Sequence, residues 1–161
     1  MNKVLKKNRG FGLIEIVIGS AIILSGILAV IASYSTYIEY ALANEKNVEA
    51  ANVLEEGLEV MTFLRNKGWN ANILPLATTT TYYLSFDGSS WTTTTTAQYV
   101  DGMFLRSINI DDVRRDGTDA ISSSGTIDPN TKKITATVSY FQGHATTTRS
   151  ISTYIANLYS N

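Results

Sequence analysis

The 161-residue chain is predicted to have an α+β fold, with an antiparallel β-sheet packed on the distal half of a long N-terminal helix. Three observations lead to this prediction. Residues 11–31 form an apolar run, and a helical pattern continues without proline to Lys67. After Trp69 the composition shifts to Thr, Ser, Tyr and Gly, and residues 133–141 alternate apolar and polar side chains as a half-buried strand does.

The apolar run reads FGLIEIVIGSAIILSGILAVI, and its only charged residue is Glu15. About 20 apolar residues at 1.5 Å each are enough for a helix to cross a membrane. No clear small-x-small cleavage site follows the run, so we expect it to be retained rather than removed as a secretory signal. The preceding segment has no acidic residue, and four basic residues should hold that end in the cytoplasm: Lys3, Lys6, Lys7 and Arg9.

One helix is expected from about Gly12 to Lys67, because Arg65 and Lys67 followed by Gly68 form a typical helix stop. An apolar stripe should face the sheet: Val48, Ala51, Leu54, Leu58 and Met61. A polar stripe with the same period should lie on the other side: Glu45, Glu49, Asn52, Glu56 and Glu59. This acidic face either contacts a neighbouring subunit or is a solvated helix surface.

The remaining elements are strands joined by turns. Residues 82–86 and 91–94 should form a hairpin around the turn residues Asp87-Gly88-Ser89-Ser90. Further strands are expected at 104–110, 133–141 and 149–155. Asp128-Pro129-Asn130-Thr131 has the sequence of a type I turn before the strand at 133–141.

Composition excludes some classes of protein. Removal of residues 1–10 leaves 9 basic and 14 acidic side chains, so no nucleic-acid partner is expected for the exported part. The chain has no cysteine, which excludes a disulfide framework. The last strands must therefore be held by hydrogen bonds and packing alone.

The segment Lys6-Lys7-Asn8-Arg9-Gly10-Phe11, followed by Glu15 in the apolar run, resembles the processing site of type IV prepilins and type II secretion pseudopilins. The resemblance implies that prepilin peptidase cuts between Gly10 and Phe11 and methylates the new amine of Phe11. It also implies that Glu15 neutralises this amine on a neighbouring subunit during assembly. Such pairing is physically reasonable, because an ammonium and a carboxylate offset each other's unfavourable burial.

From this resemblance we expect a structural protein: a subunit of a type IV pilus or related filament. Many major pilins have proline where this chain has Ala32, and this difference favours a minor subunit. The implied partners are prepilin peptidase, other pilin subunits, the inner-membrane assembly platform and membrane lipids. Two alternatives stay open. Gene neighbours encoding a secretion channel would indicate a type II secretion pseudopilin. The other alternative is a membrane-tethered adhesin or binding module that does not polymerise, and presence of the protein in sheared filaments would exclude it.

The predicted organisation has four parts. Residues 1–10 are the leader peptide, 11–33 the transmembrane and filament-core helix, 34–68 its amphipathic continuation, and 69–161 an extracytoplasmic β-rich domain. The protein would cross the membrane once, with its N-terminus in the cytoplasm, before joining a cell-surface filament.

Other candidate sites are weak. Asp111, Asp112, Asp116 and Asp119 could suggest calcium, but their spacing fits no calcium loop, and Arg114 and Arg115 would oppose the ion. His144 is the single histidine and fits a hairpin turn better than a zinc site. Threonine runs at 78–81 and 92–96 suit exposed strand ends or O-linked sugars. No catalytic motif is visible, so we expect neither enzymatic activity nor a cofactor or metal.

Overall fold

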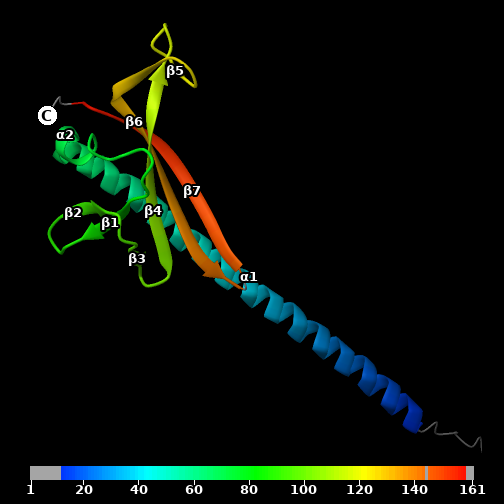
Figure 1. Cartoon of the computed structure of the whole chain (residues 1–161). Helices are drawn as coiled ribbons and strands as arrows, with labels where there is room; N and C mark the ends of the chain where they lie inside the picture. The colour runs from blue at the N-terminus through cyan, green and yellow to red at the C-terminus, as the bar shows by residue number, and fades with distance from the viewer. Residues whose placement is uncertain (1–11, 144, 159–161) are drawn as a thin grey trace, which may run out of the picture. The chain divides into compact units, whose positions relative to one another are not determined.

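The computed structural model describes residues 12–143 and 145–158 and has the predicted α+β layout, a long apolar helix followed by antiparallel sheets (Figure 1). The chain divides into two compact units between Asn44 and Glu45. The first unit holds the apolar part of the helix. The second holds the rest of the helix together with the strands of the described residues.

Helix α1 spans Leu13–Lys67, close to the predicted Gly12 to Lys67. Its last turn carries Arg65 and Lys67, as expected where backbone carbonyls lack helical partners. Gly68 donates its N–H to the carbonyl of Leu64 at 3.3 Å. The short helix α2, Trp69–Asn72, follows at once and buries the indole of Trp69 in the core.

The strands form two sheets. A two-stranded sheet pairs β1 (Tyr83–Phe86) with β2 (Trp91–Thr94), as predicted. The five-stranded sheet has the order β3-β4-β6-β7, with β5 paired to the end of β4. Its strands are β3 (Tyr99–Val100), β4 (Phe104–Arg115), β5 (Ile121–Ser122), β6 (Thr126–Gln142) and β7 (Ala145–Ala156).

The β1–β2 hairpin has the predicted turn at Asp87-Gly88-Ser89-Ser90. The Asp87 carboxylate accepts the backbone N–H groups of Ser89 and Ser90 at 2.9 and 2.7 Å. These hydrogen bonds favour the charged carboxylate and lower the pKa of Asp87. The rings of Phe86 and Trp91, which lie opposite each other, pack with centroids 5.1 Å apart.

The helix buries a different stripe from the predicted one. Leu54 and Met61 are buried and Leu58 is partly buried against the core, as expected. Val48 is 62% exposed and Ala51 is also exposed, so this part of the prediction is wrong. The residues that α1 buries are Ala50, Val53, Leu54, Gly57, Val60, Met61 and Leu64.

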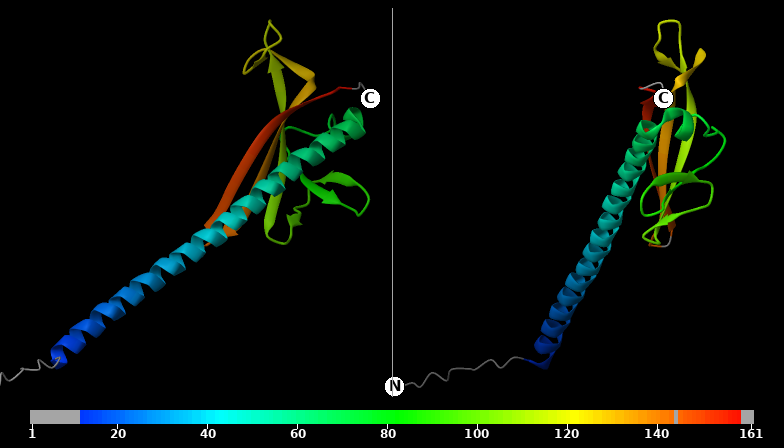
Figure 2. Two further views of the ribbon diagram at one scale, coloured as in Figure 1. Left: turned by 180° about the vertical axis from the view of Figure 1, so that it is seen from behind. Right: turned by 90° about the vertical axis from the view of Figure 1, so that its left-hand side faces the viewer.

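This stripe packs on one face of the five-stranded sheet within the second unit (Figure 2). The helix and the sheet approach each other closely at Gly57. A Cβ atom added there would lie 3.0 Å from Cδ of Arg106 and 3.5 Å from the Ala136 Cβ and Ile108 Cδ1 atoms. The helix rests directly on β4 and β6 because Gly57 has no side chain.

Four members of the predicted polar stripe are exposed: Glu45, Glu49, Asn52 and Glu59. Glu56 differs, because its carboxylate lies 2.8 Å from Nη1 of Arg106, whose side chain is only 3% exposed. The Arg106 guanidinium also donates to the carbonyl of Val53 at 3.3 Å and lies 5.6 Å from the centre of the Trp91 ring. Glu56 therefore links the helix to the sheet.

The predicted turn at Asp128-Pro129-Asn130-Thr131 is not a connection between strands. These residues lie inside β6, at a β-bulge where Asp112 pairs with Lys132 and Val113 with Asp128. The local geometry is still turn-like, since Asp128 accepts the Asn130 N–H at 2.9 Å. Pro129 fits here because a bulged residue needs no ladder hydrogen bond from its N–H.

Candidate functional site

The candidate assembly site lies at the start of α1. Glu15 is in the first helical turn, and its Oε2 atom accepts the backbone N–H of Gly12 at 2.6 Å. This is the reciprocal half of a capping box, in which a carboxylate satisfies an amide that has no helical partner. A negative charge is also favoured there by the helix dipole. The predicted processing residues Gly10 and Phe11 lie outside the described residues.

Beyond Glu15 the helix presents apolar side chains on every side. One helix in the described part of the chain is long and apolar enough to span a membrane, and none of its apolar window is buried within the structure. At least half of each of these side chains is exposed: Leu13, Ile14, Ile16, Val17, Ile18, Ile22, Ile23, Leu24, Ile27, Leu28, Val30 and Ile31. An apolar surface of this kind needs lipid or other apolar helices around it.

The hydroxyl groups in this segment are satisfied by the helix itself. Ser25 donates to the carbonyl of Ala21 at 2.7 Å, and Ser33 donates to that of Ala29 at 2.9 Å. Ser20, Ser35 and Thr36 do the same within one turn. An unsatisfied polar group in hydrocarbon costs several kcal/mol. The segment can therefore enter an apolar environment without bringing unpaired hydroxyls.

Three tyrosines follow the apolar stretch, and no role was predicted for them from the sequence. Tyr34, Tyr37 and Tyr40 are 65, 68 and 69% exposed. Tyrosine is enriched where a membrane-spanning helix leaves the hydrocarbon, because its ring is apolar and its hydroxyl is polar. The rise from Glu15 to Tyr34 is roughly 28 Å, close to the thickness of a bilayer's hydrocarbon core. The sequence did contain a signal for this interface, namely three tyrosines spaced three residues apart.

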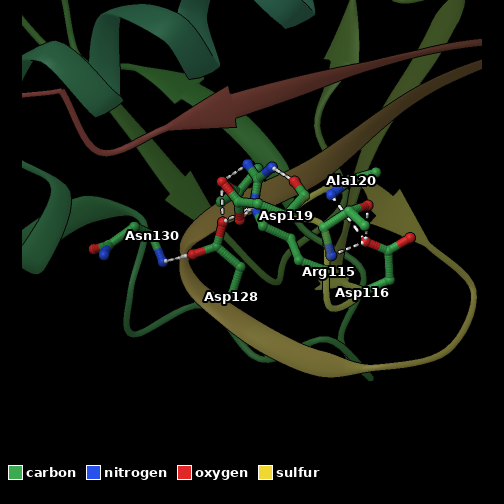
Figure 3. Close-up of polar contacts among 8 residues, drawn as sticks. Arg115, Asp116, Asp119, Ala120, Asp128 and Asn130 are labelled. Carbon is green, nitrogen blue, oxygen red and sulfur yellow. Dashed lines mark hydrogen bonds and ion pairs between the residues drawn. The ribbon is translucent and has the colours of Figure 1, made fainter.

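The charged residues at the outer end of β4 form a second cluster, far from Glu15 in sequence (Figure 3). The Asp128 carboxylate is 2.7 Å from Nε of Arg115 and accepts the Thr131 hydroxyl at 2.6 Å. These interactions, the Thr131 hydrogen bond above all, lower the pKa of Asp128 to about 2. Arg115 also donates to the carbonyl of Asp119 at 2.8 Å.

A tight turn follows β4 at residues 116–119, where the N–H of Asp119 donates to the carbonyl of Asp116 at 3.1 Å. The Asp116 carboxylate accepts the Thr118 hydroxyl at 2.7 Å and the backbone N–H groups of Thr118 and Ala120 at 2.8 and 3.1 Å. These bonds lower the pKa of Asp116. Just before β6, a Cβ atom at Gly125 would lie 2.2 Å from the Arg115 carbonyl oxygen, so only glycine fits.

Arg115, Asp119, Asp128 and Thr131 border an open hollow of about 640 Å³ beside this turn. Their charges and hydrogen bonds are directed at one another rather than into the hollow. Within residues 12–143 and 145–158 no group of three His, Cys, Asp or Glu side chains is placed to hold a metal ion. The cluster is best understood as a support for the tip of the sheet.

The remaining candidates contribute little chemistry. His144 lies outside the described residues, although the hairpin predicted there is present between β6 and β7. In the two threonine runs, part of the second forms β2, and the exposed members are Thr78, Thr79, Thr81, Thr92, Thr95 and Thr96. Their modification by sugars stays a prediction.

The chain was compared with models of known protein families, with curated proteins and with solved structures, and none of them matches.

Proposed function

We propose that this chain is a minor subunit of a type IV pilus or a related filament, inserted in the membrane by α1 and cut between Gly10 and Phe11. The proposal is supported by the sequence around these residues, the apolar helix and the α+β layout. The helix is the polymerising element. The domain that rests on residues 45–67 is the exported surface.

The observation that carries this proposal is the placement of Glu15. The carboxylate lies in the first turn of a helix whose other side chains are uncharged until Glu39. It already accepts the N–H of Gly12, the residue that follows Phe11, so it points toward the beginning of the chain. After cleavage, the amine of Phe11 on a neighbouring subunit would be its natural counter-ion, because either charge alone is costly in hydrocarbon.

The flanking residues give the proposed topology. The four basic residues before Gly10 keep the leader in the cytoplasm, and the tyrosines from Tyr34 to Tyr40 mark the opposite interface. The sheet domain is then extracytoplasmic. The partners of this proposal are prepilin peptidase, the assembly platform, lipids and other subunits.

The processing step is tested by intact-mass analysis of the protein from membranes of a host that has prepilin peptidase. We expect the mass of residues 11–161 plus one methyl group. A chain that still begins at Met1, or one that begins beyond Ala29, would contradict the proposal.

The assembly step is tested with Glu15→Val and Glu15→Gln. Valine should ease insertion by up to about 3 kcal/mol, so a defect could not be ascribed to failed insertion. Glutamine keeps an acceptor for the Gly12 N–H but has no charge. If Glu15 neutralises an amine, both variants should be cleaved and both should be depleted from sheared filaments relative to membranes. Recovery by glutamine alone would show that Glu15 only caps the helix, and wild-type incorporation of both would remove its role in assembly.

A further inference from the structure

We propose that β7 is an interaction edge that pairs antiparallel with β7 of a second copy of this chain. This contact does not depend on the proposed function. Only its biological setting, a contact between two neighbouring filaments, rests on that proposal. β7 is the last strand in the order β3-β4-β6-β7, so only one of its sides is paired within the sheet (Figure 1). Alternate residues of such a strand direct their N–H and C=O groups outward, where they can pair with another chain.

Among the described residues, the β7 edge has few of the features that usually prevent pairing. Its 12 residues stay in unbroken register with β6 from Gln142↔Ala145 to Thr131↔Ala156, without a bulge. The strand contains no proline and one charged residue, Arg149. It is otherwise rich in threonine and isoleucine, which favour extended backbone. Natural edge strands are commonly short, charged, bulged or covered.

The opposite edge of the same sheet shows these protective features. β3 covers the start of β4, the bridge between Tyr82 and Ile108 covers its middle, and β5 covers its end. Two carboxylates, Asp111 and Asp112, lie on the stretch between the bridge and β5. In a head-to-tail arrangement, β7 of one copy would pair with the β3 edge of the next. Because β3 is only two residues long, that edge offers β7 no long partner. The long pairing left to β7 is with its own copy.

The sequence of β7 is self-complementary in that arrangement. With Ile151 opposite Ile151 of the second copy, Arg149 lies opposite Thr153 and Ser150 opposite Ser152, so no like charges meet. The Ser150–Ser152 pairs would extend the hydroxyl pair already formed with β6 between Thr135 and Ser152 at 3.0 Å. Such cross-strand pairs are stabilising. Ile151, now 36% exposed, would gain an apolar partner.

A contact of this kind is isologous, since the same surface serves both copies. Isologous contacts close a dimer, whereas a helical filament is propagated by heterologous contacts. The β7 contact is therefore not the one that builds a filament. In the proposed function it would join subunits of two filaments that lie side by side.

Cysteine cross-linking of the full-length chain in detergent tests the proposal, because the sequence has no cysteine of its own. Residues opposite each other across strands have Cβ atoms about 4.5–5.5 Å apart, near the range that a disulfide can bridge. Ile151→Cys should therefore form a covalent dimer on mild oxidation. Thr147→Cys, on the same strand and the same face, should not, since its two copies would be about 27 Å apart.

The register has its own test. Thr148→Cys and Tyr154→Cys should each stay monomeric, but a mixture of the two should cross-link, because these positions lie opposite each other when Ile151 faces Ile151. The proposal would be overturned if Ile151→Cys cross-linked no more strongly than Thr147→Cys. It would also be overturned if the mixture of Thr148→Cys and Tyr154→Cys stayed monomeric, as each variant alone should.

A charge variant separates this contact from association of the apolar helices. Ile151→Lys places two like charges opposite each other and should weaken dimerisation about tenfold or more, whereas Ile151→Thr should keep it. Tryptophan fluorescence, to which buried Trp69 contributes, verifies that both variants are folded. A dimer unaffected by lysine would mean that other surfaces associate and that β7 does not pair. These measurements require neither cleavage nor filaments. The β7 contact can therefore be disproved while the proposed function stands, and the proposed function can be disproved while the β7 contact stands.

Discussion

The guanidinium of Arg106 in β4 is buried under the helix and lies 2.8 Å from the carboxylate of Glu56 in α1, which is 43% exposed. The Nε atom of Arg106 has no hydrogen-bond partner in the described structure. Trp91 of β2 packs over the same guanidinium. One cation thus links the helix, the five-stranded sheet and the small hairpin.

Glu56→Ala should destabilise the sheet domain by about 1–3 kcal/mol, because a buried guanidinium loses its charged partner. Urea unfolding of the full-length chain in detergent, followed by the fluorescence of Trp69 and Trp91, measures the change. Glu59→Ala, an exposed acidic residue one turn later, should stay within about 0.5 kcal/mol of the wild type. Equal stability of all three proteins would show that the Arg106–Glu56 pair contributes nothing.

The direct contact between helix and sheet at Gly57 predicts a steep dependence on side-chain size. Gly57→Ala gains about 1 kcal/mol of helix propensity, which the displacement of Arg106 offsets, so its net effect should be small. Gly57→Leu has no room against Ala136 and Ile108 and should lose at least about 1–3 kcal/mol. The same unfolding assay decides between them. A leucine variant as stable as the alanine variant would mean that the helix does not approach the sheet here.

The corrected buried stripe predicts an order of sensitivity to aspartate along α1. Leu54→Asp buries an unpaired carboxylate at a site that is 4% exposed and should lose more than about 4 kcal/mol. Leu58→Asp, at a partly buried site, should lose less, and Val48→Asp should change stability by no more than about 0.5 kcal/mol. Thermal melts of the three variants establish the order. A loss at Val48 as large as that at Leu54 would restore the stripe predicted from sequence.

Asp128 predicts how the domain responds to acid. Its pKa of about 2 lies below its ordinary value of 3.8, so the stabilisation it provides is present above about pH 4 and is lost as the pH falls toward 2. Asp128→Asn should lower stability at neutral pH and should flatten its decline between pH 4 and 2. Asp111→Asn, an exposed carboxylate of the same sheet, is the control and should keep the wild-type slope. If the stability of Asp128→Asn declined between pH 4 and 2 as steeply as that of the wild type, the Asp128 carboxylate would not be the source of the decline.

The helix and the main strands could be predicted because their signals are local. Arg65, Lys67 and Gly68 indicated the helix end, and the alternation from Ile134 to Tyr140 indicated a strand. The buried face of the helix was harder, since apolar residues at Val48 and Ala51 continue the same 3.6-residue period as Leu54 and Leu58. Only contact with the sheet decides between two such overlapping stripes.

Two features of the sheet domain depend on residues distant in sequence. Phe104, Arg106, Ile108 and Ile110 share one face of β4, so alternation alone could have predicted that Arg106 is buried among apolar neighbours. Its partner Glu56 could not be predicted in that way. Likewise, Asp128-Pro129-Asn130-Thr131 has a turn sequence, but both ends of this segment stay in one strand because Lys132 pairs with Asp112 of β4 and Asp128 pairs with Val113.

At the candidate site, Glu15 was evident from the sequence as the one charge in an apolar run. Its hydrogen bond to Gly12 was not, because a capping interaction depends on where the helix begins.

The bulge at Pro129–Thr131 has a consequence for how this protein can vary. It separates the tip of the sheet, from Val113 through β5 to Asp128, from the rungs that lie against the helix. The ladder restarts at Asp112↔Lys132 on the other side of the bulge, so residues gained or lost between Asp116 and Gly125 leave the register of the core rungs unchanged. Selection could therefore alter the length and chemistry of this exposed tip while the domain keeps its packing.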